Sequence, residues 1–113
     1  MITLYHNPRC RKSREGFSLL EKSGKDFEVI KYMETSISEE KLKEIINLLN
    51  IKPLELVRTN EAIWKSDYKG KSLSDEQVVK AMVEHPKLIE RPIVINGKKA
   101  IIGRPPTQLL EII

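Results

Sequence analysis

The spacing of apolar positions changes from strand-like to helical within the first third of the chain. Residues 2–5 predict a short strand, and Asn7-Pro8 ends it, because proline has no backbone donor and the residue before it avoids helical geometry. Helical spacing over about residues 11–22 predicts a helix that Gly24 is placed to end. The side of this helix expected to face the core consists of Phe17, Leu20 and, less regularly, Leu19. Residues 27–30 alternate weakly and predict a second strand.

The middle of the chain is predicted to be helical. Ser38 is placed to cap a helix whose first turn is acidic, where the helix dipole favours negative charge. The inner face of this helix consists of the apolar residues Leu42, Ile45, Ile46 and Leu49. Ser74 and Gln77 have the spacing of a capping box and open another helix, which Pro86 ends. Residues 58–60, between the two helices, stay unassigned.

The clearest pairing signal lies near the end of the sequence. Residues 93–102 hold two β-branched runs joined through Asn96-Gly97, a dipeptide that strongly favours a hairpin. Pro105 suits the first position of a last helix, whose apolar side consists of Leu109, Leu110 and Ile113. The predicted order is β-α-β, a helical insertion at about residues 36–86, and β-β-α. This order predicts an α/β fold: a four-stranded mixed sheet flanked by helices, in a single domain over residues 1–113.

Composition narrows the class of protein. The 113 residues are 40% hydrophobic and 32% charged, which suits one globular domain with a modest core. The apolar stretch at residues 93–95 is far too short to span a membrane, and the N-terminus lacks the pattern of a secretory signal. The net charge of +4 is mild, and no stacking aromatics are interleaved with the basic residues, which argues against nucleic acid as a partner. A single cysteine without a Cys/His cluster predicts no disulfide, no metal site and a reducing, cytoplasmic location.

Cys10 stands where a strand and a proline-containing loop lead into a helix. The first helical turn has unpartnered backbone N–H groups and a partial positive charge, and both favour a thiolate. The cations expected to act in the same direction are Arg9, Arg11, Lys12 and Arg14. Ser13 is placed to donate a hydroxyl hydrogen bond to the thiolate, and His6 is placed either to tune the thiol or to serve a structural role. The alternative, a small buried core cysteine, is disfavoured by the flanking arginines. Thiol redox chemistry at Cys10 is therefore predicted.

Three arginines stand in contexts that suit anion binding. Arg58 lies in an otherwise apolar neighbourhood, and Arg91 and Arg104 each directly precede a proline. A guanidinium matches a tetrahedral oxyanion and stays charged, although each arginine taken alone is equally a surface charge. An Arg-Pro pair leading into a strand is more specific, since such a proline can hold a cis bond beside a site.

Four segments resemble the glutaredoxin-coupled arsenate reductase family, in the same order and through nearly the whole chain. They are residues 6–13 (HNPRCRKS), 56–59 (LVRT), 85–94 (HPKLIERPIV) and 103–105 (GRP). The resemblance implies a thioredoxin/glutaredoxin-like fold with a helical insertion and a catalytic thiolate at Cys10. It also implies that this thiolate attacks arsenate. Glutathione, as co-substrate, and glutaredoxin then complete the reduction to arsenite, and no cofactor is bound.

The resemblance further implies roles for other residues. Arg58, Arg91 and Arg104 would hold the oxyanion, His6 and Ser13 would support the thiolate, and the bond before Pro92 would be cis. These assignments follow from the match to the family pattern.

The chain departs from the arsenate-reducing members between its cysteine and Ser13. Arg11 and Lys12 occupy positions that are commonly small and neutral, so these cations either draw in glutathione carboxylates or crowd the anion pocket. The wider family leaves two alternative functions, a general glutathione-dependent thiol reductase and a Spx-type transcriptional regulator that binds RNA polymerase. Such regulators often sense oxidation with Cys-x-x-Cys, and here Ser13 replaces the second cysteine.

Overall fold

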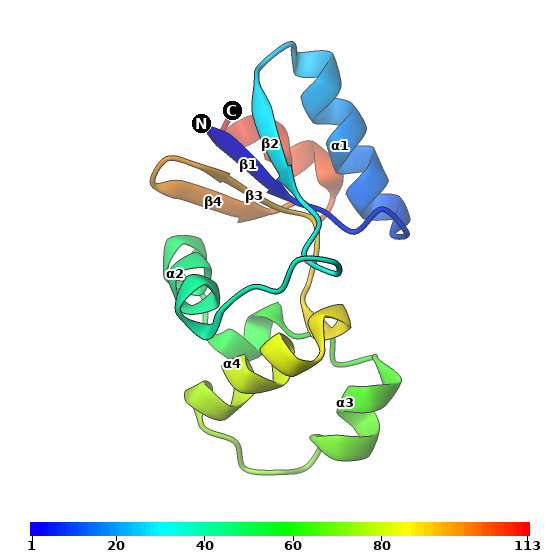
Figure 1. Ribbon diagram of the computed structural model, residues 1–113, viewed down its shortest axis with the longest axis vertical. Coiled ribbons are helices and arrows are strands. Elements are labelled where there is room, and N and C mark those ends of the chain that lie inside the picture. Colours follow the sequence, from blue (N-terminus) through cyan, green and yellow to red (C-terminus); the bar gives the residue numbers. More distant parts are fainter. The chain divides into compact units, whose positions relative to one another are not determined.

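The computed structural model describes residues 1–113, which form two compact units (Figure 1). Residues 1–35 and 91–113 make up the first unit, and residues 36–90 make up the second. The second unit therefore contains the predicted insertion and extends it from residue 86 to residue 90. None of the helices has the length and apolar character needed to cross a membrane.

The first unit is built on a sheet of four strands in the order β2-β1-β3-β4. The strands are β1 (Ile2–Tyr5), β2 (Phe27–Ile30), β3 (Ile93–Asn96) and β4 (Lys99–Ile102). The β1–β2 pair is parallel and the other two pairs are antiparallel, which confirms the predicted mixed sheet. The hairpin loop itself is Gly97-Lys98, with Gly97 at φ 63°, because Asn96 still pairs with Lys99 as the last residue of its strand.

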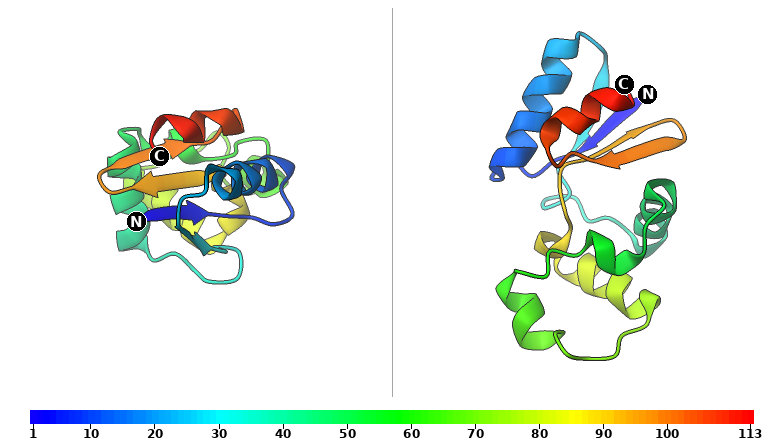
Figure 2. Two further views of the ribbon diagram at one scale, coloured as in Figure 1. Left: turned by 90° about the horizontal axis from the view of Figure 1, so that it is seen from above. Right: turned by 180° about the vertical axis from the view of Figure 1, so that it is seen from behind.

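Helix α1 (Arg11–Ser23) and the 3₁₀ helix η3 (Pro106–Glu111) pack beside each other on one face of this sheet (Figure 2). The buried residues at the centre of this packing are Ile2, Leu4, Leu20, Val94 and Leu109. Gly24 ends α1 in the left-handed conformation, as predicted. The last helix differs from the prediction: it is a 3₁₀ helix and begins at Pro106, because Pro105 keeps an extended backbone as its N-cap.

The inner side of α1 also differs from the prediction. Its buried residues are Ser13, Gly16 and Leu20, whereas Phe17 and Leu19 are only partly buried. A Cβ at Gly16 would lie 2.9 Å from Leu109 Cδ1 and 3.0 Å from Pro92 Cγ. Small residues are therefore needed where α1 meets the segment around Pro92. The spacing of large apolar side chains in the sequence does not indicate these small buried positions.

The second unit is helical, as predicted. Its elements are α2 (Glu39–Leu49), η1 (Pro53–Leu56), α3 (Ala62–Asp67), α4 (Asp75–Glu84) and η2 (Pro86–Leu88). Ser38 caps α2, and Ser74 with Gln77 forms the predicted capping box of α4. A bridge between Val57 and Ile89 joins the middle of this unit to its C-terminal end, and both residues are buried. This bridge places the unassigned residues 58–60 directly after a short paired segment.

Candidate active site

Cys10 is the N-cap residue of α1 and has an extended backbone. Its carbonyl accepts from the Arg14 N–H at 2.9 Å, which starts the helix, and its own N–H donates to the Asn7 carbonyl at 3.0 Å. The Arg14 guanidinium donates to the Pro8 carbonyl at 3.0 Å. The loop is therefore fixed at both ends, and the backbone N–H groups of Lys12 and Ser13 are directed at the thiol.

The Cys10 side chain is buried, with 8% of its surface exposed. The expectation that its arginine neighbours would keep it exposed was wrong. Arg9 and Arg11 are themselves exposed, but successive side chains at a helix start point in different directions. A charged neighbour in sequence therefore does not prevent burial.

The pKa of the Cys10 thiol lies below its ordinary value, through opposing effects. Burial raises the pKa, because a thiolate loses hydration. The Ser13 backbone N–H, the hydrogen bond and positive charge of Arg91, and the Lys12 backbone N–H lower it and prevail. The thiol is thus poised as a nucleophile by one buried guanidinium and by the helix start.

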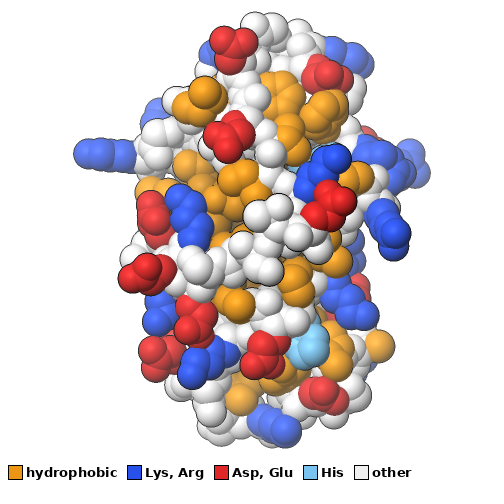
Figure 3. All heavy atoms as spheres, viewed as in Figure 1, with side chains coloured by type: hydrophobic (Ala, Val, Ile, Leu, Met, Phe, Trp, Pro, Cys, Tyr) orange, Lys and Arg blue, Asp and Glu red, His pale blue; other side chains and the backbone are white.

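The predicted cluster of cations around Cys10 is not what lowers this pKa. Figure 3 shows Lys and Arg side chains gathered at the surface over the beginning of α1. Arg11, for example, is 84% exposed in its side chain and paired with Glu15 at 3.3 Å. Solvent screens such charges, so the effective cation is Arg91, which lies far away in the sequence.

Ser13 and His6 support the Cys10 loop rather than bonding the thiol through their side chains. The Ser13 hydroxyl lies 2.6 Å from His6 Nδ1 and accepts from the Asn7 N–H at 2.9 Å. The predicted bond from this hydroxyl to the thiolate is therefore replaced by one from the Ser13 backbone N–H. Burial, together with the charges of Lys31 and Arg14, lowers the pKa of His6 and so favours the neutral ring.

Arg91 is the residue that the structure brings to Cys10. It is 9% exposed, and its side chain hydrogen-bonds the thiol. Its Nε and Nη1 are buried and have no hydrogen-bond partner. A buried charged donor without an acceptor costs several kcal/mol. An anion or a water molecule that accepts from the donor relieves this cost. Two N–H groups beside the thiol are thus ready for an anionic acceptor.

The turn that carries Arg91 is held by the C-terminal segment. The Arg91–Pro92 peptide bond is cis, as the family pattern implies, and the Arg104–Pro105 bond is also cis. Arg104 Nε donates to the Arg91 carbonyl at 3.1 Å, and the Gly103 N–H donates to the Pro92 carbonyl at 2.8 Å. Arg104 therefore contacts the backbone of Arg91 directly.

Arg58 belongs to the second unit and has acidic neighbours there. Its Nη1 lies 2.7 Å from Glu61 Oε2, and its Nε lies 3.7 Å from Glu90 Oε1. Neither glutamate was expected from the sequence. The spacing of three residues between Arg58 and Glu61 would have indicated the first, whereas the pairing with Glu90 follows from the Val57–Ile89 bridge.

Known proteins resemble this chain over nearly its whole length. An arsenate reductase from Haemophilus influenzae is 43% identical over 99% of this chain and 96% of its own length. An uncharacterized protein, YfgD, from Escherichia coli is 45% identical over 99% of this chain and 96% of its own.

Solved structures agree with this relationship. An arsenate reductase from Vibrio cholerae superimposes with a TM-score of 0.95 at 48% identity, covering 99% of this chain and 97% of that chain. A putative arsenate reductase from Yersinia pestis gives a TM-score of 0.94 at 46% identity, covering 99% and 100%. The α/β fold is thus the thioredoxin-like fold of arsenate reductases. Since the ArsC family model also matches residues 5–112, the chain belongs to the ArsC family.

Proposed function

We propose that this protein is an arsenate reductase in which Cys10 is the nucleophile. The observation that carries the proposal is the buried guanidinium of Arg91, which hydrogen-bonds the thiol and leaves Nε and Nη1 without partners. A tetrahedral oxyanion bound there meets a thiolate and two charge-assisted donors at once. Arsenate reductases are among the relatives that cover nearly the whole chain, and these names support arsenate as the oxyanion.

The reaction proceeds in three balanced steps. The Cys10 thiolate attacks arsenic in H₂AsO₄⁻, hydroxide leaves, and a thiolate–arsenate adduct forms. The thiol of glutathione then attacks the Cys10 sulfur. The electron pair of the S–As bond stays on arsenic, which falls from As(V) to As(III) and leaves as H₂AsO₃⁻, and a Cys10–glutathione disulfide remains. Glutaredoxin reduces that disulfide by thiol exchange and restores the Cys10 thiol.

Arginine residues neutralise the anion during the first step. Arg91 contacts both thiolate and oxyanion, and Arg104 supports it through its bond to the Arg91 carbonyl. Arg58 is proposed as a further oxyanion ligand on the family pattern. His6 and Ser13 are positioning residues that hold the loop. Glutathione acts as a co-substrate without a bound cofactor, which fits a cytoplasmic location where glutathione is abundant.

A coupled assay tests the proposal. Purified protein is mixed with glutathione, glutaredoxin and glutathione reductase, and arsenate-dependent NADPH oxidation is followed. We expect turnover in the wild-type protein and none in Cys10→Ser, with unchanged circular dichroism. Equal turnover in the two proteins would overturn the nucleophile assignment.

Two further outcomes would favour the alternative functions. Reduction of a mixed disulfide without any response to arsenate would indicate a general thiol reductase. Specific retention of RNA polymerase, again without arsenate turnover, would indicate a Spx-type regulator. The arsenate reductases among the relatives make both outcomes disfavoured.

A further inference from the structure

We propose that the thiol reductant binds in a pocket beside the Cys10 loop, and that this pocket selects a thiol carrying two carboxylates and an ammonium group, as glutathione does. The pocket has a volume of about 530 Å³. Its walls are Asn7, Pro8, Arg9, Lys31, Met33 and Glu34. The proposal rests on the proposed function, because it assigns the site of that reaction's second substrate.

The place of the pocket in the fold suits a ligand site. Strands β1 and β2 run parallel, with Tyr5 paired to Ile30, so both carboxyl ends reach the same edge of the sheet. The His6 N–H donates to the Ile30 carbonyl at 2.9 Å and carries this alignment beyond the strands. The segments that line the pocket follow these two strand ends directly. Ligands of open α/β sheets generally bind outside the carboxyl ends of the strands.

The walls are fixed before any ligand arrives. On one side, the Arg9 N–H donates to Asn7 Oδ1 at 3.1 Å. On the other side, the N–H groups of Glu34 and Thr35 donate to the Lys31 carbonyl at 3.0 and 2.9 Å. A volume of about 530 Å³ lies in the usual range of small-molecule sites, roughly 300–1,000 Å³. A preformed pocket of this size accommodates a tripeptide-sized molecule.

Charge indicates which molecule fits. Arg9 and Lys31 each present a cation at the pocket, and neither forms an ion pair with the chain. They can therefore bind two carboxylates. Glu34 offers an unpaired carboxylate for an ammonium group, and Met33, 44% exposed, offers an apolar contact. Two cations and one anion complement the charges of glutathione.

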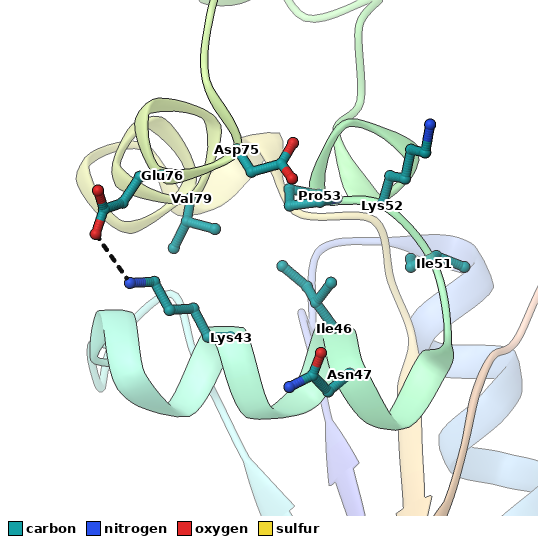
Figure 4. Close-up of a pocket in the computed structure, with 9 residues that line it drawn as sticks. All are labelled: Lys43, Ile46, Asn47, Ile51, Lys52, Pro53, Asp75, Glu76 and Val79. Atoms are coloured by element: carbon teal, nitrogen blue, oxygen red, sulfur yellow. Dashed lines mark hydrogen bonds and ion pairs between the residues drawn. The ribbon is translucent and has the colours of Figure 1, made fainter.

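A pocket of the second unit provides a contrast. It has a volume of about 460 Å³ and is drawn in Figure 4. There Ile46 and Val79 project into the space, while Lys43 is already paired with Glu76 at 3.3 Å. Lys43, one of the two lysines of that pocket, is thus neutralised by the protein, whereas neither Arg9 nor Lys31 forms an ion pair.

One lining residue connects the pocket to Cys10. Arg9 directly precedes Cys10 in the chain, so their Cα atoms are about 3.8 Å apart. A molecule held through Arg9 and Lys31 by its two ends is thereby confined next to the cysteine. Confinement of this kind raises the effective concentration of the attacking thiol at the Cys10 sulfur.

Binding of S-methylglutathione to the full-length protein tests the proposal, because this analogue keeps all the charges of glutathione but cannot react. Amide resonances are followed by NMR during the titration. We expect saturable shifts at the pocket residues, and affinities about tenfold or more weaker in Arg9→Glu and Lys31→Glu. Lys98→Glu, an exposed change of the same charge in the hairpin loop, should bind like the wild type. The diethyl ester of S-methylglutathione, which lacks both carboxylates, should also bind about tenfold or more weakly.

Three results would overturn the pocket assignment: resonance shifts of the wild type confined to other residues, absence of binding, or equal affinity of all three variants. The resonance shifts of the wild-type protein locate the ligand even if a variant fails to fold. The titration contains no arsenate, so it separates the two proposals. Arsenate turnover without binding in the pocket would overturn only this inference, and binding without arsenate turnover would overturn the proposed function.

Discussion

Two arginines of the anion-binding prediction stand in opposite electrostatic surroundings. Arg91, in the unit that holds the sheet, is 9% exposed and has two guanidinium N–H groups without partners. Arg58, in the helical unit, has a side chain that is 25% exposed and lies 2.7 Å from one glutamate and 3.7 Å from another. The first guanidinium is uncompensated apart from Cys10, and the second is compensated by the protein.

The sequence contexts of the two arginines do not predict this difference in burial and acidic neighbours. A buried cation without a carboxylate stabilises an incoming anion and a thiolate with its full charge. A cation already paired with carboxylates must share its field with them, so an anion gains less from it. The contribution of each arginine to catalysis is therefore expected to follow its acidic neighbours rather than its distance from Cys10 in the sequence.

The largest effect is expected from Arg91→Ala. This change removes a charge-assisted donor to the anion and the charge that stabilises the thiolate. Loss of one such bond corresponds to roughly 1.5–3 kcal/mol, or about 10- to 150-fold in turnover, and the double role places the loss at or above the upper figure. Arsenate turnover in the coupled assay measures it. Arg91→Lys keeps the charge but loses the planar fork, so it should recover only part of the activity.

A second measurement on Arg91→Ala distinguishes electrostatics from damage to the fold. The pKa of Cys10 is lowered in the wild type, so its alkylation by iodoacetamide should reach half its maximal rate at a lower pH than that of an unperturbed cysteine. The midpoint should move upward in Arg91→Ala, because burial raises the pKa and its main opposing charge is gone. An unmoved midpoint would contradict the role assigned to Arg91.

A smaller loss is expected from Arg58→Ala. Because Glu61 and Glu90 already balance this guanidinium, its removal should lower arsenate turnover by about tenfold or less. Glu61→Gln provides the matched control. It removes one of the charges that balance Arg58, so it should lower the KM for arsenate. An equal loss of arsenate turnover in Arg58→Ala and Arg91→Ala would contradict the proposed difference between the two arginines.

An effect on stability rather than turnover is expected from acidification. The pKa of His6 is lowered by burial and by the charges of Lys31 and Arg14, so folding favours the neutral ring. Its contribution to stability is complete above the unfolded pKa of about 6.5 and is lost as pH falls through the lower folded pKa. Urea unfolding should show a decrease of about 1 kcal/mol over that window, comparable to one hydrogen bond. His6→Gln should lack this component, and identical pH profiles would refute it.

The smallest effect is expected at the exposed cations beside Cys10. Arg11→Ser and Lys12→Ala should change arsenate turnover little, or raise it if these side chains obstruct the anion. Arg11 is 84% exposed and paired with Glu15, and exposed ion pairs are worth at most about 1 kcal/mol. A loss comparable to that of Arg91→Ala would show that surface charge, not the buried guanidinium, controls the thiol.

Much of the local structure could be predicted from the sequence, because its causes lie within a few residues. Ser38 and the Ser74–Gln77 pair satisfy N–H groups of their own helices, and Gly24 supplies a left-handed residue at a helix end. The same holds for the hairpin after residue 93 and for Cys10 at a helix start. The cis bond before Pro92, which the family pattern implies, is also present.

Other features depend on residues that only the fold brings together. Burial of Cys10, its contact with Arg91, and the pairing of Arg58 with Glu90 join segments that periodicity treats separately. The small residue at Gly16 is required by Leu109 and Pro92, both distant in the sequence. Local pattern thus determined the helices, the strands and the place of Cys10 at a helix start. Tertiary structure decided which cation acts on that cysteine, because burial and acidic neighbours set the strength of a charge and neither is encoded by adjacent residues.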